Sequence, residues 1–329
     1  MKHSNIALFV AGVGCPHRCT FCDQRTITGE PETASPEDVA PAVRTALESG
    51  TRGAQLAFFG GSFTAVPRPY MISLLEAARP FVEDGSVSGI RISTRPDSVG
   101  DEVLDILEDY GVEAVELGAQ SMRDRVLKLN RRGHTADDVV EAAERVRRHG
   151  FELGLQMMTG LPGSAPEDDL YTGRMLAELQ PATMRIYPTI VLEGTELAEL
   201  WRTGAYVPPT LDESVQVCGE LLRIFEDRGI PVIRMGLHSG GEVEEGYLAG
   251  PYHPAFRELC EGHIYLERAK DALKGAEPGK YRLSVAPSEI SKMAGQNRRN
   301  IIELEKNGYV CRIRPEDGLA HFEVRAEQI

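Results

Sequence analysis

Seven short runs rich in apolar and β-branched residues are spaced along the first 235 residues, and helical patterns separate them. Strands and helices that alternate at this spacing are typical of βα units, whose right-handed crossovers place the strands in one parallel sheet. Six or seven such units predict a full or partial α/β barrel, in which functional residues gather at the carboxyl ends of the strands. The predicted strands lie near residues 5–11, 54–59, 89–94, 113–118, 152–158, 183–188 and 231–235.

The helical patterns carry start and stop signals. Ser35 is followed by Pro36 and two acidic residues, the order of an N-cap, a proline at the first helical position and acids in the first turn. Several other patterns end at a glycine, as helices commonly do. We therefore expect a helix that begins at residue 36 and further helices near residues 100–110, 135–149, 166–179 and 211–228.

The alternation stops near residue 236, so we expect a barrel domain over residues 1–235 and an α+β extension over residues 236–329. Glycine and proline near 236–241 and 250–254 indicate loops, and we expect the segment 250–257 to form a lid near the barrel mouth. A turn at 275–279 then leads into a small βαββ unit. Its elements are predicted at residues 281–285 (strand), 287–306 (helix), 309–314 and 319–325 (strands).

Composition limits the cellular setting and the partners. The 329 residues include no run near the ~20 apolar residues of a membrane span, and no signal peptide is evident at the start. Six cysteines, half of them in one motif, argue against a secreted disulfide framework, so we expect a reducing, cytoplasmic location. Cys218, Cys260 and Cys311 are isolated and are expected to be small buried apolar residues. The net charge of −14 argues against a broadly basic nucleic-acid groove but allows a local one.

Three cysteines, Cys15, Cys19 and Cys22, form a C-x3-C-x2-C motif directly after the first predicted strand. Three thiolates can hold three irons of a [4Fe–4S] cluster and leave the fourth iron open to a small molecule. A structural zinc ion needs a fourth ligand to complete its tetrahedron, and His17 lies inside the loop between two of the cysteines. The motif therefore favours an iron–sulfur cluster, with zinc or unligated thiols as alternatives.

Four other predicted strands end in residues that suit ligand contact. Gly60-Gly61-Ser62 follows the second strand, where two glycines let the backbone approach a ligand closely. Polar residues end the third strand (93–97) and the fourth (116–121), and a Gly-Leu-Pro-Gly turn follows the fifth (156–163). Each of these is a common turn, but four of them around one cysteine loop predict a binding site at this end of the barrel.

The cysteine motif with Phe21 before its last cysteine, together with these strand ends in this order, resembles the radical S-adenosylmethionine (radical SAM) superfamily over roughly residues 5–235. The resemblance implies a partial TIM-like (βα)6 barrel and an enzyme. In that superfamily the open iron chelates the amine and carboxylate of S-adenosylmethionine, and an electron from the reduced cluster cleaves the sulfonium to a 5′-deoxyadenosyl radical. It also implies a low-potential electron donor of the flavodoxin or ferredoxin type.

The resemblance assigns roles to single residues. Cys15, Cys19 and Cys22 are the iron ligands, and Gly60, Gly61 and Ser62 receive the methionine amine. Ser62 stands where many members carry Glu, which implies a backbone contact.

Ser93 takes the ribose position, and Arg95 reaches the ribose or the methionine carboxylate. Gln120 and Arg132 match residues that hold S-adenosylmethionine in the coproporphyrinogen-oxidase branch, and Met158 lies against adenine.

Within the superfamily, the runs 116–121, 130–135, 160–163 and 185–195 resemble the catalytic subunit of the Elongator complex. Two features depart from it: that enzyme has a longer gap between its first two cysteines, and here about 94 residues follow the barrel without a Gly-rich acyl-CoA loop. We therefore expect a stand-alone bacterial relative without the acetyltransferase domain.

The Elongator resemblance implies a tRNA base as substrate, taken into the barrel mouth and covered by residues 236–329. The cations of the last predicted helix, Lys292, Arg298 and Arg299, are the expected RNA contacts. A tetrapyrrole-like or other small organic substrate is the alternative that the Gln120 and Arg132 match suggests. A non-catalytic iron–sulfur or haem carrier with the same fold is the third interpretation.

Four histidines, His134, His238, His253 and His263, are candidate catalytic or ligand residues. For His134, a hydrogen bond between a loop and a helix explains the residue as well as a functional role does. Tyr187 ends the sixth predicted strand and faces either the active site or the core; the sequence leaves both open.

Overall fold

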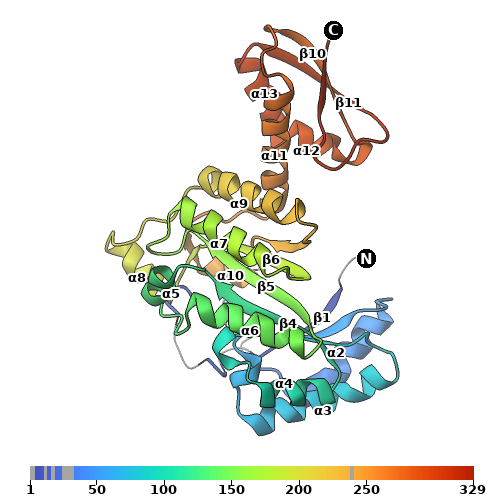
Figure 1. The fold of residues 1–329 in the computed structure, drawn as a ribbon, viewed down its shortest axis with the longest axis vertical. Coiled ribbons are helices and arrows are strands. Elements are labelled where there is room, and N and C mark those ends of the chain that lie inside the picture. Colours follow the sequence, from blue (N-terminus) through green and yellow to red (C-terminus); the bar gives the residue numbers. More distant parts are fainter. Residues whose placement is uncertain (1–3, 11–12, 16–18, 24–32, 238–240) are drawn as a thin grey trace.

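The computed structural model describes residues 4–10, 13–15, 19–23, 33–237 and 241–329, so His17 and His238 lie outside the described residues. Seven parallel strands form one curled sheet in the order β1-β2-β3-β4-β5-β6-β8 (Figure 1). Because β1 and β8 are the two edges of this sheet, the barrel is open on one side. The strands are β1 (Asn5–Phe9), β2 (Gln55–Phe59), β3 (Ile90–Thr94), β4 (Val112–Gln120), β5 (Glu152–Thr159), β6 (Thr183–Pro188) and β8 (Val232–Met235). The predicted partial α/β barrel is confirmed.

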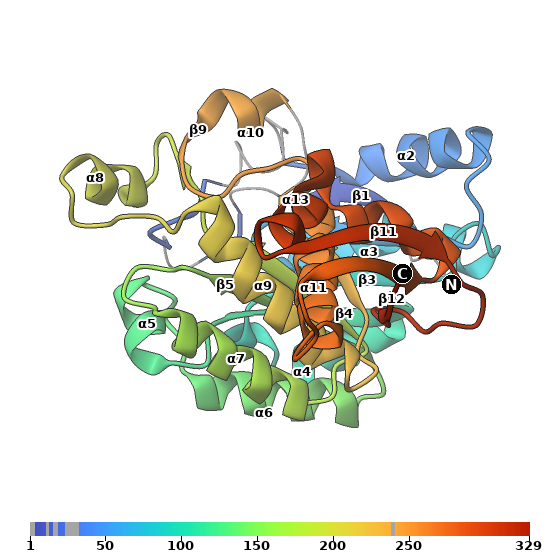
Figure 2. The ribbon, with the colours of Figure 1, turned by 90° about the horizontal axis from the view of Figure 1, so that it is seen from above.

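Helices cover the convex face of this sheet (Figures 1 and 2). They are α2 (Pro36–Glu48), α3 (Arg68–Glu83), α4 (Asp101–Asp109), α6 (Ala136–Arg148), α7 (Pro166–Glu178) and α9 (Leu211–Glu226), with short 3-10 turns at Phe63–Ala65 and Pro96–Ser98. The short helices α5 (Asp124–Leu129) and α8 (Glu196–Arg202) lie instead in the connections that follow β4 and β7. Helix α3 has no predicted counterpart, because prolines at 67, 69 and 80 interrupt its apolar pattern.

Alternation along the strands separates an apolar from a polar face of the sheet. Residues such as Phe58, Ile92 and Leu117 are fully buried beneath the helices. The alternate positions, such as Arg91 and Glu116, point into the lumen and are also buried. Parallel strands covered on both faces are usually apolar throughout, so the polar lumen indicates a functional interior.

The chain after β8 divides into two parts. Residues Gly241–Gly246 form α10, and β9 (Tyr247–Ala249) pairs antiparallel with β7 (Val191–Leu192), which follows β6. This part therefore lies near the carboxyl ends of the strands, beside α8 (Figure 2).

Helix α11 (Phe256–Ala272) then packs against α9 and leads to the C-terminal unit, residues 279–329 (Figure 1). The unit is a three-stranded sheet in the order β11-β10-β12 with helices on one face. Its elements are β10 (Gly279–Val285), a 3-10 turn (Pro287–Glu289), α12 (Ile290–Ala294), a second 3-10 turn (Gln296–Arg298), α13 (Arg299–Lys306), β11 (Tyr309–Pro315) and β12 (Arg325–Gln328).

Two local predictions for this region are wrong, and one helix was not predicted. The helix predicted over 287–306 breaks at Gly295, Asn297 and Arg298, which have φ of 71°, 52° and 61°. The buried side chain of Asn300 stabilises the break by donating to the carbonyls of Gly262, Lys292 and Met293. The last strand lies at 325–328 instead of 319–325, and α11 occupies a segment where no helix was predicted.

Candidate functional site

The cysteine segment 19–22 is held between two helices that follow other strands. The amide of Cys22 donates to the carbonyl of Cys19 over 3.3 Å, which closes a turn. Thr20 bonds Asn130, after α5, through its backbone amide (3.4 Å) and through its hydroxyl (2.8 Å). The amide of Leu197, in α8, donates to the Thr20 carbonyl over 2.8 Å. The position of the cysteines therefore depends on the packing of α5 and α8.

Gly14 places the start of the cysteine loop against the end of β2. Its φ is +85°, and a Cβ at this position would lie 2.5 Å from the carbonyl oxygen of Ser62 and 2.8 Å from the side chain of Val66. Gly60 and Gly61 also have positive φ, of 78° and 69°. Only glycine adopts this backbone and this contact without strain, so the glycines bring the loops after β1 and β2 together.

Arg132 connects the cysteine segment to the end of β4. This side chain is buried, with 6% of its surface exposed. Its Nη1 donates to the sulfur of Cys19 over 3.2 Å, and its Nη2 donates to the carbonyl of Gly118 over 2.6 Å. Its own carbonyl accepts a hydrogen bond from Arg95, at the end of β3. The segments that follow β1, β3 and β4 therefore meet at one residue, Arg132.

Ser62 and Arg95 are joined at the ends of β2 and β3. The hydroxyl of Ser62 is fully buried, lies 2.8 Å from the hydroxyl of Thr94 and accepts from the amide of Arg95 over 3.3 Å. The guanidinium of Arg95 makes two 2.9 Å bonds to Asp97. The Ser62 side chain is thus occupied within the protein, and its backbone remains the part suited to a ligand.

Three buried polar atoms around Arg132 have no hydrogen-bond partner among the described residues: Nη1 of Arg95, Nε of Arg132 and Oε1 of Gln120. Gln120 adopts a φ of 65°, and its amide nitrogen would lie 3.1 Å from a Cβ on Gly118, beside Arg132. An unsatisfied buried polar group costs about 1–3 kcal/mol. Donors and an acceptor left unpaired beside a thiol fit a bound molecule that is zwitterionic and polar, as S-adenosylmethionine is.

Burial and mutual repulsion disfavour ionised thiols in the absence of a cation. Burial, together with Cys19 and Cys15, raises the pKa of Cys22 to about 12. Cys15 is exposed at its surface, yet desolvation by the surrounding protein and then Cys19 raise its pKa, against the opposing effect of Arg95 and Arg132. Metal binding requires thiolates and supplies the positive charge that stabilises them. The donor set therefore fits a thiolate-bound iron cluster.

The lumen below the strand ends holds a buried ionic network. Glu116 accepts from Arg91 over 3.2 Å and from Arg185 over 2.9 Å. Ser93 lies at its edge, with its hydroxyl 3.4 Å from Glu116 and 3.5 Å from the amide of Gln156. Ser93 therefore sits deeper in the barrel than the cysteines and bonds protein groups.

Met158 and Tyr187 share the lumen face above this network, since they are register partners on β5 and β6. Met158 also packs against a small apolar cluster that contains Cys19 and Phe21. Tyr187 thus faces the lumen, which resolves the question that its sequence position leaves open.

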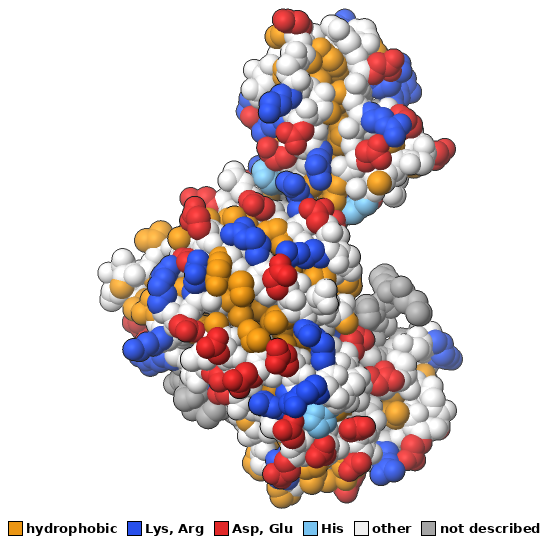
Figure 3. Space-filling view, viewed as in Figure 1, with side chains coloured by type: hydrophobic (Ala, Val, Ile, Leu, Met, Phe, Trp, Pro, Cys, Tyr) orange, Lys and Arg blue, Asp and Glu red, His pale blue; other side chains and the backbone are white. Residues whose placement is uncertain are grey.

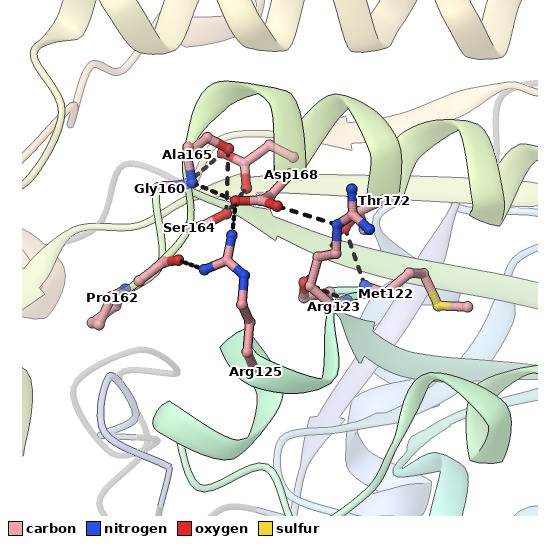
Figure 4. Close-up of polar contacts among 12 residues, drawn as sticks. Met122, Arg123, Arg125, Gly160, Pro162, Ser164, Ala165, Asp168 and Thr172 are labelled. Carbon is pink, nitrogen blue, oxygen red and sulfur yellow. Dashed lines mark hydrogen bonds and ion pairs between the residues drawn. The ribbon is translucent and has the colours of Figure 1, made fainter.

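Asp168 and Asp169, at the start of α7, hold the Gly160–Gly163 turn after β5. Asp169 accepts from the amide of Gly160 over 2.8 Å and from the hydroxyl of Ser164 over 2.5 Å. Asp168 accepts from Arg125 and, over 3.1 Å, from Arg123 (Figure 4). Sequence reasoning missed both residues, because two acids in the first turn of a helix are ordinary.

Of the described candidate histidines, His134 and His253 have backbone partners, while the Nδ1 of His134 is buried without one. His134 is buried, and its Nε2 lies 3.2 Å from the carbonyl oxygen of Ala119. Burial and then the charge of Arg132 lower the pKa of His134 to about 4, so the ring is neutral. The Nδ1 of His253 accepts from the amide of Ala255 over 3.0 Å, and His263 is half-buried on α11 beside α9.

A cavity of about 400 Å³ opens beside Cys19 and Cys22 at the mouth. Charged pairs form part of its wall, with Arg131 2.7 Å from Glu196 and Arg202 2.5 Å from Glu193. The cavity connects the cysteine segment to α8. Its lining residues are Cys19, Cys22, Arg131, Glu193, Gly194, Thr195, Glu196, Glu199 and Arg202.

Two known protein families match the sequence of this chain, and their matches include the residues of this site. The family described as the radical SAM superfamily matches residues 9–176, just over half of the chain, and the radical SAM C-terminal domain matches residues 181–267. The chain therefore belongs to the radical SAM superfamily of enzymes. The resemblance on which the sequence prediction rests is confirmed.

Curated relatives of similar sequence include tRNA uridine(34) acetyltransferases and Elongator complex protein 3. A tRNA uridine(34) acetyltransferase of Dehalococcoides mccartyi is 31% identical over 241 residues, which cover 62% of this chain and 52% of that protein. An uncharacterized protein of Methanocaldococcus jannaschii is 30% identical over 253 residues, covering 73% of this chain and 76% of that one. Elongator complex protein 3 of Schizosaccharomyces pombe is 30% identical over 55% of this chain and 39% of its own length. The chain thus spans about half the length of the first relative and less of the last.

Solved structures share the fold. The archaeal Methanocaldococcus infernus Elp3 superposes with a TM-score of 0.64 at 22% identity, over 82% of this chain and 63% of that chain. Coproporphyrinogen III oxidase from Escherichia coli superposes with a TM-score of 0.50 at 20% identity, over 69% of this chain and 54% of that chain. Within the described residues, none of the helices has the length and apolar character that a membrane crossing requires.

Proposed function

We propose that this protein holds a [4Fe–4S] cluster on Cys15, Cys19 and Cys22, cleaves S-adenosylmethionine reductively, and acts on a base of tRNA. The observation that carries the proposal is the buried guanidinium of Arg132, which contacts Cys19 and lies with unpaired polar atoms of its own, of Arg95 after β3 and of Gln120 at the end of β4. A cation at a thiolate and open hydrogen-bonding groups beside it suit a cluster with a polar cosubstrate.

The spacing of the thiols supports a cluster over a single zinc ion. Tetrahedral zinc at about 2.3 Å from each sulfur places the sulfurs about 3.8 Å apart. Cys15, Cys19 and Cys22 do not form a group of ligand atoms within 4.8 Å of one another. A cubane cluster spreads its three thiolates over three separate iron atoms.

The residues around the cluster divide the work of binding S-adenosylmethionine. When bound, the cluster and cosubstrate supply a 5′-deoxyadenosyl radical. The backbone at Gly60, Gly61 and Ser62 suits the methionine amine, because positive φ at both glycines exposes main-chain groups. The unpaired Nη1 of Arg95 and Nε of Arg132 suit the carboxylate.

Other groups suit the nucleoside. The unpaired Oε1 of Gln120 can accept a hydrogen bond from a polar group of the nucleoside, and Met158 offers an apolar surface to adenine. Ser93 lies deeper in the barrel, on the side proposed for the ribose. The apolar residues around Cys19 and Phe21 exclude water from the site. A carbon radical needs such a dry site, because it reacts with any hydrogen donor that it meets.

The names of the curated relatives support a tRNA substrate, since the match to a tRNA uridine(34) acetyltransferase covers 62% of this chain. A base has to leave the helical stack to enter a barrel mouth, and this costs least in an unpaired loop. We therefore propose a base of a tRNA loop as the target. A cytoplasmic location and a flavodoxin- or ferredoxin-type electron donor complete the proposal.

The test is anaerobic reconstitution followed by measurement of 5′-deoxyadenosine with and without bulk tRNA. We expect formation under reducing conditions and an increase when tRNA is present. Cleavage that rises only with small organic extracts would replace tRNA with a small-molecule substrate. Binding of S-adenosylmethionine without 5′-deoxyadenosine under any condition would support a carrier.

Cysteine variants test the ligand assignment. Cys19→Ala should abolish the visible absorbance of the cluster and lower iron and sulfide to background. Cys218→Ala and Cys311→Ala are matched controls, because both thiols are buried in the apolar core away from the motif. A full cluster in Cys19→Ala contradicts the proposal.

A further inference from the structure

The C-terminal unit has a sheet face that its own helices leave open. In β10, Tyr281, Leu283 and Val285 point into the core beneath the helices, while Lys280 and Arg282 are exposed on the opposite side. The register places Arg312 of β11 beside Arg282, and Arg314 beside Ser284. On the other edge, Arg325 of β12 also lies opposite Ser284. We call the exposed residues Lys280, Arg282, Arg312, Arg314 and Arg325 the basic sheet face.

The charge of this unit differs from that of the rest of the chain. Residues 279–329 contain nine Lys or Arg and seven Asp or Glu, a net charge of +2. Residues 1–278 contain 27 Lys or Arg and 43 Asp or Glu, a net charge of −16. Figure 3 shows Lys and Arg side chains interspersed with acidic ones on this unit, beyond the α9 side of the barrel. The basic sheet face is therefore a local exception on an acidic protein.

Several cations of the basic sheet face are free. Arg282 pairs with Glu327 at 2.8 Å, and Arg325 pairs with Glu316 and Glu323. Among the described residues, no carboxylate pairs with Lys280, Arg312 or Arg314, and each of the three is exposed.

Two of the three cations predicted to contact RNA from the helix, Lys292 and Arg299, are instead paired with carboxylates. Lys292 lies 3.0 Å from both Glu261 and Glu289, and Arg299 lies 3.0 Å from Asp212. Arg298 is exposed and has no ion pair among the described residues, so it is the one predicted helical contact that stays free. Most of the free positive charge of the unit therefore lies on the opposite face.

We propose that the basic sheet face binds the phosphate backbone of a structured RNA and anchors the tRNA whose base the barrel mouth receives. This inference rests on the proposed function. The face carries no aromatic side chain on which a base could stack, so it contacts phosphates and does not read sequence. On this side of the sheet, Val310 and Ile329 are the exposed large apolar residues among the described ones, and two such residues are too few for insertion into a lipid surface.

The position of the unit predicts the size of the RNA. Helix α11 has 17 residues, about 25 Å at about 1.5 Å per residue, and carries the basic sheet face away from the strand ends (Figure 1). A free nucleoside or a short loop reaches the mouth alone. A full-length tRNA has the extent to contact both places, so the face should favour tRNA over an isolated hairpin.

The test compares the full chain with Arg312→Gln/Arg314→Gln and with a control of equal charge change, Arg44→Gln/Arg174→Gln. The control arginines are exposed on α2 and α7 and have no ion pair among the described residues, and all four side chains point to solvent, so the fold should persist. Affinity is measured over a range of salt for full-length tRNA, for an isolated anticodon-type hairpin, and for anionic phospholipid vesicles. 5′-Deoxyadenosine formation without RNA is measured in parallel.

Each lost phosphate contact should lower the slope of log K against log salt by about 0.7–0.9. We expect the sheet variant to bind tRNA roughly 25–60-fold more weakly at about 0.1 M salt, with a slope smaller by about 1.4–1.8. It should also lose the preference for tRNA over the hairpin and keep RNA-independent 5′-deoxyadenosine formation.

Three outcomes overturn the inference. If the sheet variant and the control bind tRNA equally well, the basic sheet face is not the tRNA anchor, and the proposed function is unaffected. Loss of vesicle binding without loss of tRNA binding reassigns the face to a lipid surface. Absence of tRNA binding by the unaltered protein even at low salt removes the tRNA substrate itself, and the anchor with it.

Discussion

The guanidinium of Arg132 lies 3.2 Å from the sulfur of Cys19, although 113 residues separate them in the chain. A hydrogen bond from a cation stabilises negative charge on sulfur and is one of the groups by which a protein tunes a cluster potential. The same side chain holds the carbonyl at Gly118 and so connects the cluster site to the end of β4. Its removal should therefore change the cluster without unfolding the barrel.

Arg132→Met tests this relationship. Reduction adds negative charge to the cluster, and without the cation the potential should fall. A hydrogen bond to a charged group contributes about 1.5–3 kcal/mol, and about 1.4 kcal/mol corresponds to about 59 mV for one electron, so the fall should not exceed about 130 mV. An anaerobic redox titration measures it, with Lys128→Met, an exposed cation on α5, as control. A potential equal to that of the control would sink the assignment.

Gly14→Ala should displace the cysteine loop, because its Cβ would lie 2.5 Å from the Ser62 carbonyl. Gly50→Ala is a matched control, since Gly50 has the same backbone conformation, with a φ of +86°, but no neighbour within 4 Å. The left-handed conformation alone costs an alanine about 1–2 kcal/mol. We expect both variants to lose that much stability and only Gly14→Ala to lose iron. Equal iron content in the two would contradict the role of this contact.

Asp169 should make stability depend on pH near neutrality. Burial raises its pKa to about 6, so its contribution to folding is complete below the unfolded value of about 4 and disappears as the pH rises through about 6. Two pK units correspond to about 3 kcal/mol. Urea unfolding from pH 4 to 7.5 should show this decline in the unaltered protein and not in Asp169→Asn. An unchanged pH profile in the variant refutes the assignment.

Asp168 is the control of opposite sign. Burial would raise its pKa, but the Ala165 amide and Arg125 outweigh burial and hold the pKa below its ordinary value. Its contribution is present above the unfolded pKa and is lost as the pH falls through the lowered one. Asp168→Asn should therefore lower stability at pH 7 and leave the decline near pH 6 unchanged.

Glu116→Gln should destabilise the barrel strongly. Glu116 is 2% exposed and neutralises Arg91, which is 1% exposed, as well as Arg185. Removing one partner of a buried ion pair costs about 3–5 kcal/mol, because the other charge stays buried. Glu113→Gln alters an exposed position on the same strand and should change stability by less than about 0.5 kcal/mol. Chemical unfolding of both variants measures the difference, and similar values would show that the network is not ionic.

Local pattern was enough to predict the seven strands, five of the helices and a full or partial barrel, and the family resemblance indicated the partial form. Strand and helix periods, capping residues and glycine stops are properties of neighbouring residues, and they need no knowledge of the fold. The same holds for Cys15, Cys19 and Cys22, whose spacing alone indicates a metal cluster. Helix α11 was not predicted from the sequence. It packs between α9 and the C-terminal unit and is buried on several sides, so its apolar residues do not form the one-sided stripe that marks an amphipathic helix.

The tertiary structure alone decided which polar groups meet. The sequence alone does not show that Arg132 donates a hydrogen bond to Cys19 or that the hydroxyl of Ser62 is hydrogen-bonded to Thr94. It also does not show that Glu261 and Glu289 neutralise the charge of Lys292. It also cannot tell that two neighbouring acids, Asp168 and Asp169, have opposite pKa shifts. These properties depend on burial and on charges contributed by distant segments, which arise only when the sheet curls and the helices pack against it.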